Sequence, residues 1–233
     1  GRYITSLATY IFSAYINHAH LLIAGPNAES IANAFSIGMF GRYPGVLDCG
    51  NKYSKMAIDA ISNTVNEVVI IKSAFATAWR DAVMSLLSEK NKFFILICPY
   101  AEDLVIEPKG LFNYVLPLFT ETVVVDYPQN KFVGKKLAAN YENYERCKKK
   151  PLYSALLRKV NANMLLTNKM QQVLTDLHYL DKNADSVVDY MYLLFPYAYI
   201  AGCGDAIAEA LKSKNMADID KVEFMIKYLG EEE

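Results

Sequence analysis

The sequence predicts an α/β protein: a mostly parallel sheet with flanking helices, followed by an all-helical region. Short apolar runs alternate with helical patterns between residues 20 and 126, and this alternation is typical of parallel strands connected by helices. Beyond Pro128 the strand-like runs stop and only helical periodicity continues. We therefore expect an α/β core over residues 1–130 and a helical, lid-like domain over residues 131–233.

The individual elements follow from local patterns. Residues 3–18 are predicted to form a helix because Leu7, Ile11 and Tyr15 recur on one face. The other helices predicted in the core are 28–40, 53–63, 76–89 and 108–118, and its predicted strands are 20–24, 46–49, 67–73, 93–98 and 122–125. The helices predicted beyond the core are 131–147, 151–160, 162–180, 184–195, 203–214 and 217–229.

The composition argues against several classes of protein: nucleic-acid-binding, zinc-binding, disulfide-rich and membrane-spanning. The net charge of -1 gives no global attraction to nucleic acid or to an acidic membrane. The four cysteines include no CxxC pair, which argues against a zinc site or a disulfide scaffold and favours a reducing, cytoplasmic compartment. No run reaches the roughly 18 apolar residues of a membrane span, so we expect no membrane segment. Because the chain begins with Gly1 rather than Met, we expect it to be part of a longer protein.

The stretch from His20 to Ser36 has the outline of a phosphate loop. An apolar strand runs into a glycine turn and then a helix, which leaves unpaired N–H groups as a cradle for an anion. A phosphate loop follows the pattern G-x-x-x-x-G-K-[ST]. If Ser30 matches its hydroxyl residue, Glu29 takes the lysine position and the loop is about two residues short. The structural alternative is that Asn27 or Ser30 caps the helix and Glu29 complements its dipole. The candidate binding residues are Gly25, Pro26, Asn27, Ala28, Glu29 and Ser30.

This order of elements resembles an AAA+ ATPase module, in which a P-loop NTPase core precedes a helical lid. In that family LLIAGPNAES would carry the Walker A loop, and VVIIKSAF would end in the two Walker B acids, where Lys72 and Ser73 stand instead. FFILICPYAED would end at the sensor 1 residue, but Cys98 and its neighbours supply no clear Asn or Thr. LFNYVLPLFTETVVVDY has Leu118 where the family has an arginine, and GCGDAIAEALK has Asp205 at the usual sensor 2 arginine. The resemblance implies the strand order 5-1-4-3-2.

The layout of the family is kept while its catalytic residues are replaced. Phosphoryl transfer depends on positive charge and metal around the phosphates, so the resemblance implies degenerate Walker motifs, no cofactor and a pseudoenzyme. We expect a non-catalytic module of a larger, bacterial, cytoplasmic protein that acts in assembly, self-association or protein–protein contact. One alternative is an ATPase-like domain whose nonstandard loop binds an anion, or ATP or ADP with Mg. Another is an α/β enzyme of a different class.

Two sets of residues could serve such an enzyme, because each follows a predicted strand. Asp48 and Cys49 form the first set, for which the structural alternative is a buried thiol. Glu102, Asp103 and Glu107 form the second, for which the alternative is a solvated loop.

Basic residues and histidines complete the candidates. A basic cluster with tyrosines nearby could contact nucleic acid, and the alternative is an exposed helix-end loop. His18 and His20 lack a third ligand nearby, so no metal site is expected, and His178 is expected to be structural. The members of the basic cluster are Arg146, Lys148, Lys149 and Lys150.

Overall fold

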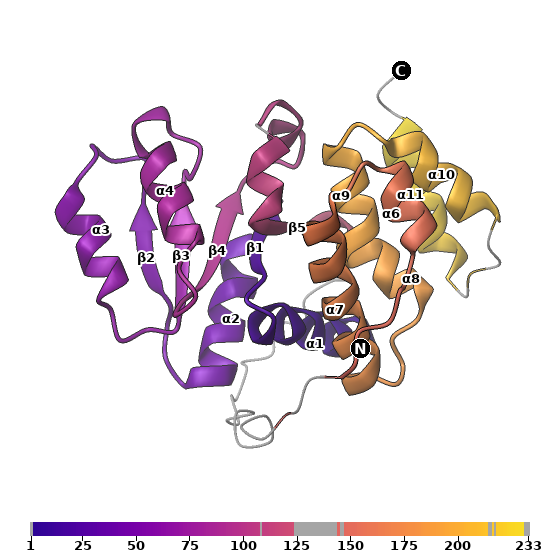
Figure 1. The fold of residues 1–233 in the computed structure, drawn as a ribbon, viewed down its shortest axis with the longest axis horizontal. Helices are drawn as coiled ribbons and strands as arrows, with labels where there is room; N and C mark the ends of the chain where they lie inside the picture. Colours follow the sequence, from indigo (N-terminus) through magenta and orange to yellow (C-terminus); the bar gives the residue numbers. More distant parts are fainter. Residues whose placement is uncertain are drawn as a thin grey trace.

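A computed structural model of the chain describes residues 2–107, 109–123, 144, 147–213, 216 and 218–230. Within these residues a five-stranded, all-parallel sheet with flanking helices precedes a helical C-terminal region, as the sequence predicts (Figure 1). The strands are β1 (His20–Ala24), β2 (Gly45–Asp48), β3 (Val68–Lys72), β4 (Phe93–Cys98) and β5 (Val115–Phe119).

The helices lie close to their predicted ranges in most of the chain. Those of the α/β part are α1 (Arg2–Ile16), α2 (Ala28–Phe40), α3 (Lys55–Ser62), α4 (Arg80–Leu87), α5 (Thr120–Val123) and the 3₁₀ helices η1 (Thr77–Trp79), η2 (Glu102–Ile106) and η3 (Lys109–Asn113). Those of the C-terminal region are α6 (Ser154–Lys159), α7 (Met164–Leu180), α8 (Ser186–Asp189), the π-helical turn η5 (Tyr190–Leu194), α9 (Phe195–Ile200), α10 (Gly204–Ser213) and α11 (Ile219–Gly230).

The strand order determines which loops meet at the carboxyl edge of the sheet. Taken from β5, the order is β5-β1-β4-β3-β2, which equals 5-1-4-3-2. Strand β1 lies inside the sheet, where Leu22 is opposite Leu96 of β4 and Pro117 of β5. Because all the strands are parallel, the turn after β1 lies beside the residues that follow β4 and β5.

The last strand differs from the prediction. The sequence predicts a helix over 108–118 and a strand over 122–125, but the structure has η3, then β5, then the short helix α5. Pro117 disfavours a strand in general, yet β5 is an edge strand, where one side of the backbone needs no ladder hydrogen bonds. The predicted domain boundary after residue 130 and nearly all of the predicted helix 131–147 lie outside the described residues.

The C-terminal helices pack beside β5, at the opposite end of the sheet from β2 and α3 (Figure 1). Helix α9 and the π-helical turn contact β5, and α1 packs along α7. The buried apolar side chains form one cluster that runs from the sheet into these helices. Among the residues that the structure describes, no helix combines the length and apolar character needed to cross a bilayer.

The π-helical turn has a local cause and a tertiary contact. The N–H of Phe195 donates to the carbonyl of Tyr190, five residues earlier, and Pro196 has no N–H to donate. The carbonyl of Met191, which the N–H of Phe195 would meet in an α-helix, instead accepts a hydrogen bond from the Thr122 hydroxyl at 3.2 Å. This contact joins α5 to the C-terminal region.

Candidate functional site

The turn between β1 and α2 is tightly packed. Gly25 has φ 106°, a conformation that favours glycine, and its N–H donates to the carbonyl of Cys98 at 3.0 Å. A side chain at Gly25 would collide with the hydroxyl of Thr120, which follows β5. Asn27, with φ 63°, completes the turn, and α2 begins at Ala28.

The N-terminus of α2 has no side-chain cap. Asn27 occupies the cap position, but its side chain makes no capping hydrogen bond, so the predicted capping by Asn27 is wrong. The left-handed backbone at Asn27 explains this difference, because a capping side chain normally requires an extended backbone at that position. By contrast, Ser54, Asn163 and Asp185 cap α3, α7 and α8 in the ordinary way.

Glu29 and Lys72 form an ion pair across this edge of the sheet. Their carboxylate and ammonium groups are 2.8 Å apart, and the two side chains are 47% and 35% exposed. Glu29 lies in the first turn of α2, where its charge complements the helix dipole, and Lys72 ends β3. A partly exposed pair of this kind contributes about 0–1 kcal/mol to stability, so its main importance is the charge that it places here.

Thr120 was not among the predicted site residues. It is fully buried, and within the described part of the chain its hydroxyl oxygen has no hydrogen-bond partner. The hydroxyl faces Gly25 because β5 pairs directly with β1. No motif in the sequence marks Thr120, since the contact depends on the pairing of the two strands.

A groove lies beside this turn, at the carboxyl ends of β3 and β4. We call it the β3–β4 groove; its cavity has a volume of about 390 Å³. The predicted residues Asp103 and Glu107 line it together with Cys98. Burial raises the pKa of the Cys98 thiol, and the nearby carboxylates of Asp103, Glu107 and Glu102 raise it further, so this thiol is a poor nucleophile. The other lining residues are Ser73, Phe75, Ala76, Ile97, Pro99 and Ile106.

Asp48 and Cys49 do not join this groove. They end β2, which is separated from β4 by β3, and two strand spacings amount to about 10 Å. The Asp48 carboxylate accepts a hydrogen bond from the N–H of Gly50 at 2.9 Å. Burial, with a contribution from Asp48, raises the pKa of Cys49 to about 11, which suits a core thiol. The two predicted enzyme sets therefore do not share one cavity in the described residues.

Among the histidine and basic candidates, His20 and Lys149 make hydrogen bonds within the chain. The ring of His20 is buried, with Nε2 3.1 Å from the carbonyl of Leu87 and Nδ1 3.2 Å from the N–H of Phe94. Both ring nitrogens are thus engaged. Where side chains are described, no group of three His, Cys, Asp or Glu residues could hold a metal. Of the basic cluster, Arg146 lies outside the described residues, and the exposed Lys149 donates to the side chain of Asn168.

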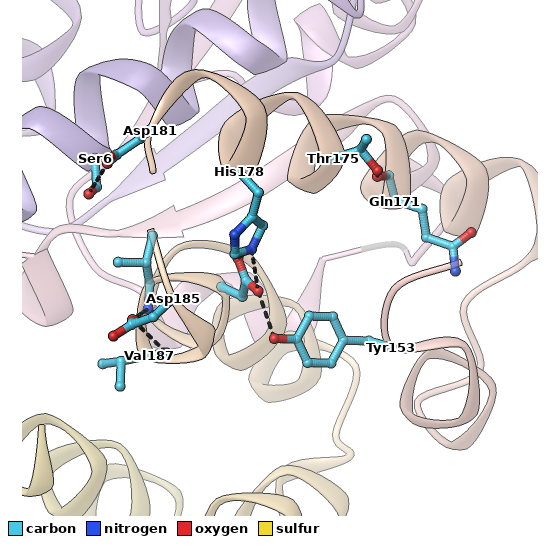
Figure 2. Close-up of polar contacts among 10 residues, drawn as sticks. Ser6, Tyr153, Gln171, Thr175, His178, Asp181, Asp185 and Val187 are labelled. Carbon is cyan, nitrogen blue, oxygen red and sulfur yellow. Dashed lines mark hydrogen bonds and ion pairs between the residues drawn. The ribbon is translucent and has the colours of Figure 1, made fainter. Parts of the chain in front are cut away.

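His178 belongs to a second polar cluster, in the C-terminal region. His178 and Tyr153 point to one carboxylate, that of the buried Asp189, at 2.9 Å and 2.6 Å (Figure 2). The hydrogen bond to Asp189 raises the pKa of His178. This cluster ties the start of α6 to α7 and α8, which is a structural role.

No protein-family model, curated protein or solved structure matches the chain. The chemistry of the candidate site therefore has to be inferred from its own residues.

Proposed function

We propose that the chain is a non-catalytic AAA+-like module of a bacterial, cytoplasmic protein, and that it acts in assembly or protein contact. One observation carries the proposal: the ion pair between Glu29 and Lys72. The resemblance assigns these two positions to the Walker A lysine and the Walker B aspartate. The charges of both positions are reversed, and the two side chains bind each other.

The reversed pair opposes nucleotide binding. A phosphate at the start of α2 would lie beside the carboxylate of Glu29, which repels it. Lys72 is already paired with that carboxylate, so the pair as a whole offers the phosphate no net attraction. Lys72 ends the strand that would hold magnesium, and an ammonium group is not a metal ligand. The ion pair thus removes both attractive contacts of the family, the one with the phosphates and the one with magnesium.

The strand order and two further positions agree with the proposal. The order 5-1-4-3-2 is the one that the resemblance implies. Leu118, which stands where the family has an arginine, is fully buried in β5. Asp205 lies in the first turn of α10, where a carboxylate complements the helix dipole. Both positions at which the resemblance expects an arginine therefore hold a residue with a structural role here.

Isothermal titration calorimetry with ATP and with ADP, each with and without Mg²⁺, tests the proposal. We expect no binding heat up to about 1 mM nucleotide, a dissociation constant that corresponds to only about 4 kcal/mol of binding free energy. We also expect no release of phosphate from ATP. Micromolar, magnesium-dependent binding with hydrolysis would overturn the proposal.

The alternative function, an anion-binding domain, is favoured by the uncapped N-terminus of α2 and the unpartnered hydroxyl of Thr120. Pyrophosphate separates the two proposals. If Glu29 excludes anions, the wild-type chain does not bind pyrophosphate, whereas Glu29→Lys, which puts two ammonium groups beside the helix, does. Glu29→Gln is the intermediate variant, since it removes the repulsion and leaves one ammonium group, that of Lys72, beside the helix; it should bind pyrophosphate more weakly than Glu29→Lys does. Binding of pyrophosphate by the wild-type chain would support the alternative.

A further inference from the structure

We propose that the β3–β4 groove binds a segment of a partner protein in which an apolar side chain stands next to a lysine or arginine. The inference rests on the proposed function, because it names the chemistry of the partner that the module would contact. It is carried by the walls of the groove and by the charges at its rim.

The walls of the groove are apolar and open to solvent. Phe75, Ala76 and Ile97 are half-buried along it, and Ile106 at its rim is 84% exposed. Large apolar side chains exposed around a cavity indicate a contact surface, because covering them removes apolar area from water. A volume of about 390 Å³ lies near the small end of ligand pockets, which fits one or two side chains of a segment.

The rim of the groove is negatively charged. The side chains of Asp103 and Glu107 line it, and Glu102 precedes Asp103 in η2. Of the described cations, Arg80 reaches Glu107 at 3.6 Å, while Lys109 donates to backbone carbonyls instead. The carboxylate of Asp103 forms no hydrogen bond or ion pair within the described residues.

Charge complementarity selects the partner. Two lining carboxylates, of which only that of Glu107 meets a guanidinium, leave the rim negative, so an acidic or phosphorylated segment is repelled and a basic one is attracted. The apolar walls require that the basic residue has an apolar neighbour, since charge alone would leave Ile106 uncovered. An aliphatic residue beside a lysine or arginine meets both conditions.

Fluorescence polarisation with three labelled peptides tests the inference. The probes are Ser-Leu-Lys-Leu-Lys-Ser, its acidic form Ser-Leu-Glu-Leu-Glu-Ser and its polar form Ser-Asn-Lys-Asn-Lys-Ser. We expect the basic, apolar peptide to bind at least about tenfold more tightly than either of the others. Its affinity should fall as salt is added, because salt screens the attraction between the charges.

Two variants of the groove and two matched controls locate the binding. Ile106→Ser and Asp103→Asn should each lower the affinity for the basic, apolar peptide by about three- to tenfold. The controls are Met56→Ser and Asp59→Asn on α3, which remove an equally exposed apolar side chain and an exposed carboxylate away from the groove. The control variants should bind as the wild-type chain does.

Several outcomes would overturn the inference: equal binding of all three peptides, no binding of any, or equal effects of the groove and control variants. A dimer in sedimentation that Ile106→Ser dissociates would also overturn it, because a second copy would then occupy the groove. Calorimetry with nucleotides tests the proposed function, and peptide binding tests this inference. Because the two experiments measure different ligands, failure of one proposal can be told apart from failure of the other.

Discussion

His20 begins β1 with its ring held between the backbone of two segments. Nδ1 accepts from the N–H of Phe94, so Nε2 carries the proton and donates to the carbonyl of Leu87. This arrangement needs the neutral ring. Burial, with a smaller contribution from the charge of Lys169, lowers the pKa of His20 from 6.5 to about 4.

We therefore expect the free energy of unfolding to fall as the pH is lowered from 6.5 to 4. The unfolded chain binds a proton at His20 in this range and the folded chain does not, so stability is greatest above pH 6.5 and is lost below it. The loss attributable to His20 is about 3 kcal/mol at pH 4. Urea unfolding of the wild-type chain and of His20→Gln at several pH values measures it. If the unfolding free energy of His20→Gln falls with pH as steeply as that of the wild-type chain, the pH dependence does not come from His20.

For His178 we expect the opposite pH dependence of the free energy of unfolding, and His178→Gln tests it. The pKa of His178 is raised by Asp189, so the contribution of its charged form is complete below the unfolded pKa and is lost as the pH rises through the folded pKa. We expect His178→Gln to destabilise the chain more at pH 5 than at pH 8, again by urea unfolding. A larger effect at pH 8 would show that the ion pair with Asp189 contributes little.

At the scale of elements, continuous apolar runs predicted β1, β3 and β4 well, because strands buried on both faces of a parallel sheet show such runs. Apolar runs gave the wrong prediction at β5 and α5, where a helix and then a strand were expected. Pro117 weakened one apolar run and the β-branched Thr122 and Val123 strengthened the next, although contacts with the C-terminal region decide both. Local patterns contain no information about those contacts.

Thr122 tests how far such a contact stabilises α5. Its hydroxyl is buried and lies 2.8 Å from the carbonyl of Phe119 and 3.2 Å from that of Met191. Thr122→Val keeps the shape but leaves both carbonyls without this donor, so we expect a loss of about 1–3 kcal/mol in urea unfolding. Thr122→Ser keeps the hydroxyl and is the control. A valine variant as stable as the serine variant would show that the hydrogen bonds contribute little.

At the scale of the whole molecule, the sequence identified the residues of the candidate site one by one but not their neighbours. Glu29 and Lys72 were each singled out, yet their ion pair depends on α2 packing against β3 and β4. Thr120 meets Gly25 only because β5 pairs with β1. Such pairings depend on the strand order, which local periodicity does not determine.

The same long-range contacts join the sheet to the C-terminal helices. Asp176 of α7 is fully buried and accepts hydrogen bonds from the side chains of Asn17 at 2.7 Å and Tyr144 at 2.9 Å. Ser6 of α1 donates to Asp181 at 2.5 Å (Figure 2). Helix α1 is thus bound to α7 by polar contacts as well as by the shared apolar cluster.

We therefore expect the sheet and the C-terminal helices to unfold in one cooperative transition. The single tryptophan, Trp79, is buried beside the sheet and its fluorescence reports that part, while circular dichroism at 222 nm reports the helices throughout. The two signals should give the same urea midpoint. Asp176→Ala should lower both midpoints together, by about 2 kcal/mol in unfolding free energy, and Asp176→Asn, which keeps one acceptor oxygen, should lower them less. Midpoints that separate in the wild-type chain would show two independent units, with the buried cluster between them too weak to couple their unfolding.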